Sequence, residues 1–276
     1  VSNAVYADAA GRIPWVSRQG NSYLLISYRK GYIRLSPMPS RHASAYAHAF
    51  SSAVEWWTAH GGKPDPFKLD NELSQEVLDL LQRKYSIDVQ VAPPNDHRTN
   101  RAERAIGTAK THIIATLATA PPECPISLWE DFLPQIEITL NTLRPYALDK
   151  TISAYEGVIG SPFDFARYPL APCGTSVAIH TPPNARPTWG VHAHKGFYVG
   201  PALLGYRTFR VWVPATQSIR ESNSLAWYSR YAMPGSQPLD ILQAAINDFT
   251  SALDRLTATV GHSDEPEYHQ ARDALS

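Results

Sequence analysis

The chain has 276 residues, of which 43% are hydrophobic, and its 25 basic side chains balance its 25 acidic ones. This length and composition predict one domain of about 150 residues with a packed core and a smaller second domain. The absence of an apolar run of about 18 residues, and of a signal-peptide pattern, argues against a membrane protein. Cys124 and Cys173 lack the spacing of metal ligands, which favours two thiols in an intracellular protein over a disulfide or a zinc site.

Short apolar or alternating runs predict strands near residues 4–8, 22–28, 31–36, 66–70 and 87–91. Helical spacing of apolar residues predicts helices over residues 43–59 and 127–143, and further apolar stripes predict helices after residue 70 and around residue 103. The resulting order is three strands, a helix, a strand, a helix, a strand and further helices. This α/β order is typical of a ribonuclease-H-like core, a mixed five-stranded sheet with flanking helices.

Three carboxylates stand at the ends or beginnings of these predicted elements. Asp8 follows a short apolar run, Asp70 ends the segment FKLD, and Glu103 opens a helix three residues after Asn100. Taken singly, each has an ordinary explanation: a turn-opening Asp, a helix cap and a capping box. The combination is more informative, because before residue 65 the only acids are Asp8 and Glu55.

A divalent-metal site would explain why such acids come together. Crowded carboxylates repel one another unless a cation neutralises them, and hard oxygen ligands suit Mg²⁺ or Mn²⁺. Two such ions about 3.5–4 Å apart can activate the attacking oxygen and stabilise the leaving oxygen at phosphorus. Asp65 is an alternative to Asp70, but Pro64 and Pro66 flank it and no regular strand could hold it rigidly. The three acids therefore predict a site for cutting and joining nucleic acid.

Longer segments around these acids resemble the catalytic core of retroviral-type integrases encoded by long-terminal-repeat retrotransposons. The resemblance spans residues 4–231 and lies in GRIPWVSRQGNSYLLI, LDNELSQ, APPNDHRTNRAERAIGTAK, LWEDFLPQIEITLNTLRP and SAYEGVIGSPFDF. It implies that Asp8, Asp70 and Glu103 are both the catalytic residues and the ligands of Mg²⁺ or Mn²⁺. It also implies two reactions: 3′-end processing of DNA, in which water attacks, and strand transfer into target DNA, in which a DNA 3′-hydroxyl attacks.

The zero net charge conceals an uneven distribution along the chain. Residues 175–231 hold six basic side chains against Glu221 alone, whereas residues 232–276 hold seven acids against Arg255 and Arg272. The basic stretch contains the β-type runs VAIH, GFYVGP, TFRVWVP and SLAWYS, separated by Pro, Gly, Asn or Ser. These runs predict a small β-barrel, and KGFYVGPALLGYRTFRVWVP resembles the SH3-like carboxy-terminal domain of integrases.

Aromatic and basic side chains are the candidate DNA-contacting groups. Four aromatic side chains are predicted to form the barrel core, with base stacking as the alternative: Trp189, Tyr198, Phe209 and Trp212. The basic side chains predicted to contact DNA phosphates are Arg98, Arg101, Arg104 and Lys110 beside Glu103, and Lys195, Arg207 and Arg210 on the barrel. Ordinary solvated helix and strand faces would explain the same charges.

The predicted organisation is a core over residues 1–165, a linker over 166–174, a DNA-binding barrel over 175–231 and an acidic helical tail over 232–276. The resemblance implies DNA partners, namely element ends and target DNA, a homo-oligomer, no membrane, and action in the nucleus if the host is eukaryotic. The amino-terminal zinc domain usual in integrases has no counterpart here, so we expect a piece of a longer polyprotein.

Two other functions fit the same sequence. A ribonuclease-H-like nuclease that only hydrolyses its substrate would use the same acids. A non-catalytic DNA-binding remnant of a decayed or domesticated element would keep the fold and the basic barrel. The intact acid triad argues against such decay.

Overall fold

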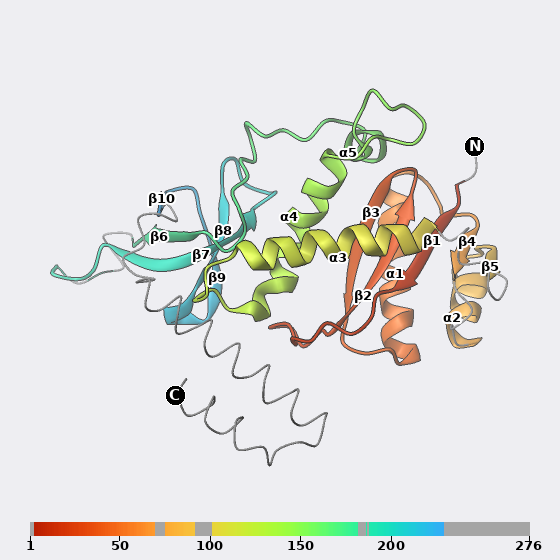
Figure 1. Ribbon diagram of the computed structural model, residues 1–276, viewed down its shortest axis with the longest axis horizontal. Helices are drawn as coiled ribbons and strands as arrows, with labels where there is room; N and C mark the ends of the chain where they lie inside the picture. The colour runs from red at the N-terminus through yellow and green to blue at the C-terminus, as the bar shows by residue number, and fades with distance from the viewer. Residues whose placement is uncertain (1–2, 70–74, 92–100, 182–185, 187, 229–276) are drawn as a thin grey trace, which may run out of the picture. The chain divides into compact units, whose positions relative to one another are not determined.

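A computed structural model describes residues 3–69, 75–91, 101–181, 186 and 188–228 of the chain (Figure 1). Contacts between residues divide the chain after Trp227, and the described residues up to that point form one compact first unit. The predicted acidic tail, residues 232–276, lies outside the described residues. Within the described ranges, no helix is long and apolar enough to span a lipid bilayer.

The first unit contains a five-stranded mixed sheet with the order β3-β2-β1-β4-β5. The pairs β1–β2 and β2–β3 are antiparallel, whereas β1–β4 and β4–β5 are parallel. The strands are β1 (Val5–Ala9), β2 (Tyr23–Arg29), β3 (Tyr32–Met38), β4 (Phe67–Leu69) and β5 (Val89–Val91). Each lies where the sequence predicted a strand, and this mixed five-stranded sheet with flanking helices has the arrangement predicted for a ribonuclease-H-like core.

Helices cover both faces of this first sheet. β2 shows why, because Leu25 points to one face and its neighbours Leu24 and Ile26 point to the other. Leu25 belongs to a buried cluster with α1 (Ala43–Ala59), and Leu24 and Ile26 belong to a cluster with α3 (Arg101–Thr119) and α4 (Trp129–Thr142). The other helical segments are α2 (Gln75–Asp79), which continues as the π-helical η1 (Leu80–Lys84), the 3-10 turn η3 (Ile126–Leu128) and α5 (Ala154–Ile159).

A second, antiparallel sheet follows with the order β10-β6-β7-β8-β9. Its strands are β6 (Ser176–His180), β7 (Ala193–Pro201), β8 (Phe209–Val213), β9 (Ser218–Ser222) and β10 (Leu225–Trp227), with the 3-10 turn η5 (Pro214–Thr216) between β8 and β9. Its own buried cluster consists of Val177, Ile179, Tyr198, Val211 and Val213. The β-rich composition is thus confirmed, and closure into an SH3-like barrel stays a prediction.

The aromatic side chains predicted as barrel core have three different environments. Tyr198 is fully buried among the strands, with Phe209 partly buried beside it. Trp212 is buried instead in the cluster that contains α3 and α4. Trp189 is 98% exposed, so its assignment to the core was wrong. The reason is its position in the β6–β7 connection, beyond the last pairing of Thr181 N with His192 O.

α4 closes the outer edge of the first sheet at β3. Asn141 accepts a hydrogen bond from the backbone N–H of Ile33 at 2.8 Å and donates one to the Ile33 carbonyl at 2.8 Å. Glu137 accepts a bond from the N–H of Leu35 at 3.0 Å. The next outward-facing position, two residues along the strand, is Pro37, which has no N–H. The described edge of β3 therefore presents few backbone N–H and carbonyl groups with which another strand could pair.

α4 also connects the first sheet to the second. Gln135 donates to the carbonyl of Ala171 at 2.6 Å and accepts from the Tyr198 hydroxyl at 2.7 Å. Phe197 of β7 and Trp212 of β8 lie in the same apolar cluster as α4. The two sheets therefore belong to one compact unit, and the predicted limits of core, linker and barrel stay predictions.

We expect Asn141→Ala to lower the free energy of unfolding by about 2–4 kcal/mol, because it leaves the N–H and carbonyl of Ile33 buried without partners. Urea unfolding followed by circular dichroism measures this change. Leu143→Ala is the control, since Leu143 follows α4 and is 76% exposed, and should stay within about 0.5 kcal/mol of the parent chain. An Asn141→Ala variant as stable as the control would contradict the role of α4 as an edge cap.

Candidate active site

Asp8 lies near the end of β1, on the face of the first sheet that α3 and α4 cover. The alternation along the strand shows this, because Val5 and Ala7 are buried in the cluster on the α1 side. Ala10 belongs to the cluster on the α3 side. Asp8 is two residues before Ala10 and therefore points to the same face. Asp8 is partly buried, and its Oδ1 accepts a bond from the N–H of Ala9 at 2.6 Å.

Glu103 lies in the first turn of α3 and is exposed. Ala105 and Ala109 of the same helix are buried against the sheet, so Glu103 projects from the side of α3 that faces solvent. α3 packs against β1 and β2. The structure thus brings Asp8 and Glu103 to the same side of the first sheet.

The second predicted acid, Asp70, lies outside the described residues. Its sequence neighbour Leu69 ends β4 and pairs in register with Ala7, the residue before Asp8.

Asp65 occupies the opposite end of the strands. Its backbone N–H bonds to the carbonyl of Asn3 at 3.3 Å, next to the start of β1. Asn3 and Asp8 are five residues apart, which is about 16 Å along an extended strand. Because β1 and β4 are parallel, Asp65 is a poor partner for Asp8 in a metal site.

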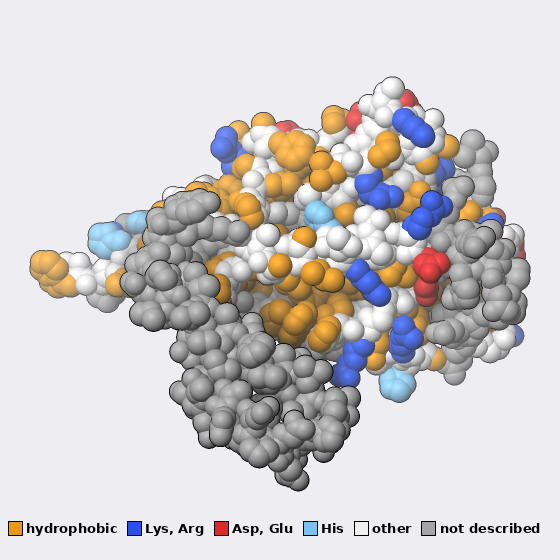
Figure 2. Space-filling model, in the orientation of Figure 1, with side chains coloured by type: hydrophobic (Ala, Val, Ile, Leu, Met, Phe, Trp, Pro, Cys, Tyr) orange, Lys and Arg blue, Asp and Glu red, His pale blue; other side chains and the backbone are white. Residues whose placement is uncertain are grey.

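Among the basic side chains predicted to contact DNA, Arg98 lies outside the described residues, and Arg101 is described only as part of the α3 backbone. Arg104 and Lys110 are exposed on α3. Lys110 follows Glu103 by seven residues and therefore lies on the same side of the helix, two turns along. Figure 2 shows Lys and Arg side chains on the face of the molecule that carries α3.

On the second sheet, Lys195 and Arg207 are exposed. Arg210 is only partly accessible, since its Nη2 lies 3.7 Å from Oδ1 of buried Asp131. Asp131 therefore partly neutralises the Arg210 guanidinium within the protein. The predicted contact of Arg210 with DNA stays a prediction.

Two cations beside Asp8 were not found from the sequence. Lys68 pairs across the sheet with Tyr6, which has the parity of Asp8, and its Nζ lies 5.5 Å from the Tyr6 ring. Arg41 reaches the carbonyl of Ala9 with Nη2 at 3.4 Å. The alternation of side chains in a strand formed by FKLD would have predicted Lys68 on the same face as Asp70. No local pattern indicates Arg41, because the fold brings it to Ala9 from 32 residues away.

The donor set suits a hard divalent cation. Within the described ranges, no group of three or more His, Cys, Asp or Glu side chains is gathered as a metal site, and one member of the predicted triad lies outside those ranges. Asp8 and Glu103 supply carboxylate oxygens, which Mg²⁺ and Mn²⁺ prefer. Glu103 is exposed and Asp8 is only partly buried, so a cation between protein and phosphate could be reached from solvent.

Three other acids, which were not predicted as site residues, are buried on α4. Glu130 accepts bonds from Ser17 and from Asn21, and Asp131 is paired with Arg18 at 3.2 Å. Glu137 accepts bonds from Tyr32 Oη at 2.9 Å and Arg34 Nη1 at 2.8 Å. Their oxygens are occupied by protein donors, which indicates a structural role. The helical spacing of Glu130, Glu137 and Asn141 was the sequence signal that could have indicated a polar stripe along one side of this helix.

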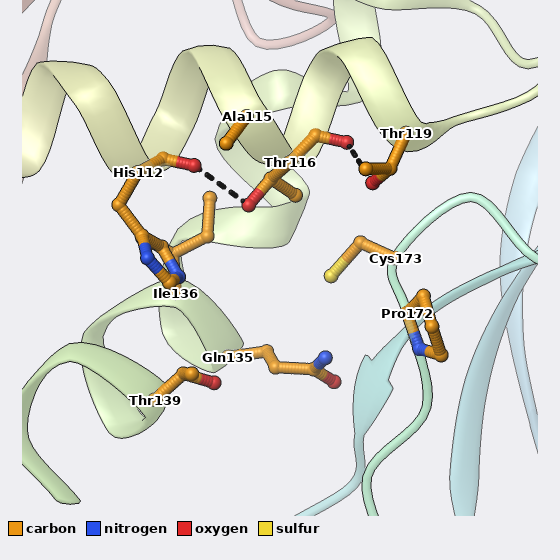
Figure 3. Close-up of a pocket in the computed structure, with 9 residues that line it drawn as sticks. All are labelled: His112, Ala115, Thr116, Thr119, Gln135, Ile136, Thr139, Pro172 and Cys173. Carbon is orange, nitrogen blue, oxygen red and sulfur yellow. Dashed lines mark hydrogen bonds between the residues drawn. The ribbon is translucent and has the colours of Figure 1, made fainter. Parts of the chain in front are cut away.

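A cavity of about 250 Å³ lies between α3, α4 and the segment before β6 (Figure 3). His112 and Thr116 line it from α3, Gln135 and Thr139 from α4, and Cys173 from the chain that follows. None of the lining residues is acidic, and Gln135 already bonds to Ala171 and Tyr198. Burial raises the pKa of the Cys173 thiol to about 12, which makes it a poor nucleophile.

No family model and no curated protein matches the chain. Among solved structures it is similar to the catalytic core domain of BIV integrase, at 14% identity and a TM-score of 0.43 over 58% of this chain and 95% of that one. It is also similar to a simian T-cell lymphotropic virus intasome in complex with PP2A regulatory subunit B56 gamma (15%, TM-score 0.46, 83% and 80%). A third is the HTLV-2 integrase catalytic core domain in complex with magnesium, in its dimeric form (19%, TM-score 0.42, 59% and 98%). With scores this low, the fold assignment rests on the chain's own strand order.

Burial raises the pKa values of both thiols, Cys124 and Cys173, to about 12 from the ordinary value of 9.0. Above pH 9 the unfolded chain therefore loses thiol protons that the folded chain keeps, so stability is complete below that pH and falls as pH rises. We expect the free energy of unfolding to drop by about 1 kcal/mol per thiol from pH 9 to 10. Urea titrations at both pH values measure it, and a Cys124→Ala/Cys173→Ala variant should show a flatter dependence. An equal slope in both chains would refute the assignment.

Proposed function

We propose that the chain is the integrase part of a long-terminal-repeat retrotransposon polyprotein and catalyses metal-dependent 3′-end processing and strand transfer of DNA. The observation that carries the proposal is that Asp8 on β1 and Glu103 on α3, a helix that packs against β1, lie on the same side of a ribonuclease-H-like sheet. The register of β4 against β1 supports Asp70 as the third acid, since Leu69 pairs with Ala7.

In this proposal Asp8, Asp70 and Glu103 hold Mg²⁺ or Mn²⁺, which when bound supplies charge neutralisation at phosphorus and an activated attacking oxygen. The strand and the helix contribute rigidity, because both backbones are fixed by regular hydrogen bonding. The attacking group decides the outcome: water gives trimmed ends, and a DNA 3′-hydroxyl gives joined strands.

The described cations suggest a path for the DNA. Lys68 and Arg41 lie beside β1, where they suit the phosphates next to the reacting bond. Arg104 and Lys110 continue along α3, whose 19 residues extend about 28 Å, the length of about eight base pairs. Lys195 on β7 and Arg207 in the β7–β8 connection would contact phosphates further along the DNA. We also propose a homo-oligomer, and action in the nucleus of a eukaryotic host.

The decisive experiment is strand transfer of a pre-trimmed duplex oligonucleotide into plasmid with Mg²⁺ or Mn²⁺. We expect Asp8→Asn, Asp70→Asn and Glu103→Gln each to lower joined product by at least about 100-fold, because each removes a charged metal ligand. Asp65→Asn and Glu123→Gln are matched controls at exposed acids outside the proposed site, and should retain activity. Circular dichroism checks that all variants fold.

The outcomes separate the three candidate functions. Cleavage by the parent chain without joining would favour a nuclease that only hydrolyses. DNA binding without any metal-dependent product would favour a non-catalytic remnant. Full activity of Glu103→Gln, or loss of activity in Asp65→Asn, would overturn the assignment of the acids.

A separate prediction concerns Lys68. Lys68→Met should weaken binding of duplex DNA about 3- to 10-fold and lower the slope of log affinity against log salt by about 1, as expected for one lost phosphate contact. Fluorescence anisotropy at several salt concentrations measures both quantities. Lys150→Met is the control, since Lys150 is exposed in the connection between α4 and α5. An unchanged salt slope would remove Lys68 from the DNA path.

A further inference from the structure

The connection between β6 and β7 presents an indole ring to solvent. Trp189 is 98% exposed and Val191 is 66% exposed, whereas the other exposed tryptophans, Trp15 and Trp227, reach 45% and 42%. Residues 188–192 of this connection, which the structure describes, are called the β6–β7 arm. Figure 1 shows them extending beyond the rest of their sheet, and Figure 2 shows apolar atoms there with His side chains beside them. A tryptophan this open to water contributes nothing to the packing of the described fold.

The arm lies in a stretch of chain that contains Arg186 and Lys195 and no acids. No Asp or Glu occurs between Asp164 and Glu221. Lys195 and His180 are exposed near the base of the arm. A long acid-free stretch of sequence that carries basic side chains favours a polyanion as partner over a protein surface of mixed charge.

The pairing of the strands places Lys195 and His180 on one face. Ala178 pairs with Lys195, and His180 pairs with Ala193, so Lys195 and His180 point to the same side of the sheet. Further along β7, Phe197 has the same parity and is buried in the cluster that includes α4. The face that contacts α4 thus continues outward as a basic, solvent-exposed face that leads to the arm.

We propose that the described residues of the β6–β7 arm bind unpaired DNA nucleotides, with Trp189 stacked on a base and with Lys195 and His180, at the base of the arm, near phosphates further along the same strand. An aromatic ring beside basic side chains is the combination that holds single strands, because every base has a π-face and every nucleotide a phosphate. Paired bases inside a duplex offer no such free face, which is why we favour single strands. The proposal deepens the proposed function and rests on it, since cutting and joining leaves unpaired nucleotides at DNA ends.

Fluorescence anisotropy of a labelled 12-nucleotide oligo(dT), compared with a 12-base-pair duplex, tests the proposal. Trp189→Ala should weaken binding of the single strand about 5- to 100-fold and leave binding of the duplex within about twofold. Trp189→Phe should recover most of the loss, because it keeps an aromatic face. Leu204→Ala is the matched control, since Leu204 is 100% exposed in the β7–β8 connection, and should bind both DNAs like the parent chain.

Equal affinity of Trp189→Ala and the parent chain for oligo(dT) would overturn the proposal, as would an equal loss for single strand and duplex. Failure of Trp189→Phe to recover binding would also overturn it, because the requirement would not be an aromatic face. These measurements need no divalent metal and no catalysis. Loss of strand transfer in the acid variants and loss of single-strand binding in Trp189→Ala are therefore separate results.

Discussion

The polar side of α4 is the constraint on which the rest of the described structure depends. β3 is an edge strand, and packing a helix along it removes its outward N–H and carbonyl groups from water. Each such group left without a partner would cost about 1–3 kcal/mol. Asn141 and Glu137 supply those partners at Ile33 and Leu35. The helix is therefore held in register with the strand by hydrogen bonds as well as by apolar contact.

That placement fixes two neighbouring parts of the molecule. Glu130 and Asp131, at the start of α4, hold the loop before β2 through Asn21 and Arg18. Gln135, one turn further, bonds to the segment that leads into the second sheet. α3 lies in the same apolar cluster as α4. The orientation of α3, and with it the position of Glu103 relative to Asp8, follows from how α4 sits on the sheet.

Acids in this protein divide into two kinds by their access to solvent and partners. Glu130, Asp131 and Glu137 are buried, and donors from the strands and loops occupy their oxygens. Glu103 is exposed and Asp8 only partly buried, on a side of the sheet that also carries cations. A buried carboxylate with full hydrogen bonding stabilises one conformation. An accessible carboxylate beside cations can instead meet a metal ion and a phosphate, which supports the proposed function.

The sequence by itself determined the elements whose pattern is local. The short apolar run near residues 22–28 predicted the strand that is β2, and the helical spacing over residues 43–59 predicted α1 with the same limits. It also singled out Asp8, because acids are scarce before residue 65, and Glu103, because it opens a predicted helix within a segment that resembles an integrase core. Nothing local identified Glu137 of α4 as a partner of β3, since its contacts join residues about 100 positions apart, such as Tyr32 and Glu137.

Only the tertiary structure decided which side chains are covered. Trp189 was predicted as core from its residue type, yet among the described residues its side chain is 98% exposed. Arg41 reaches Ala9, and Asp65 lies at the far end from Asp8, because of the parallel register of β1 and β4 and the path of the chain between them. Periodicity along a chain shows which side chains share a face, whereas what covers that face depends on contacts between distant segments.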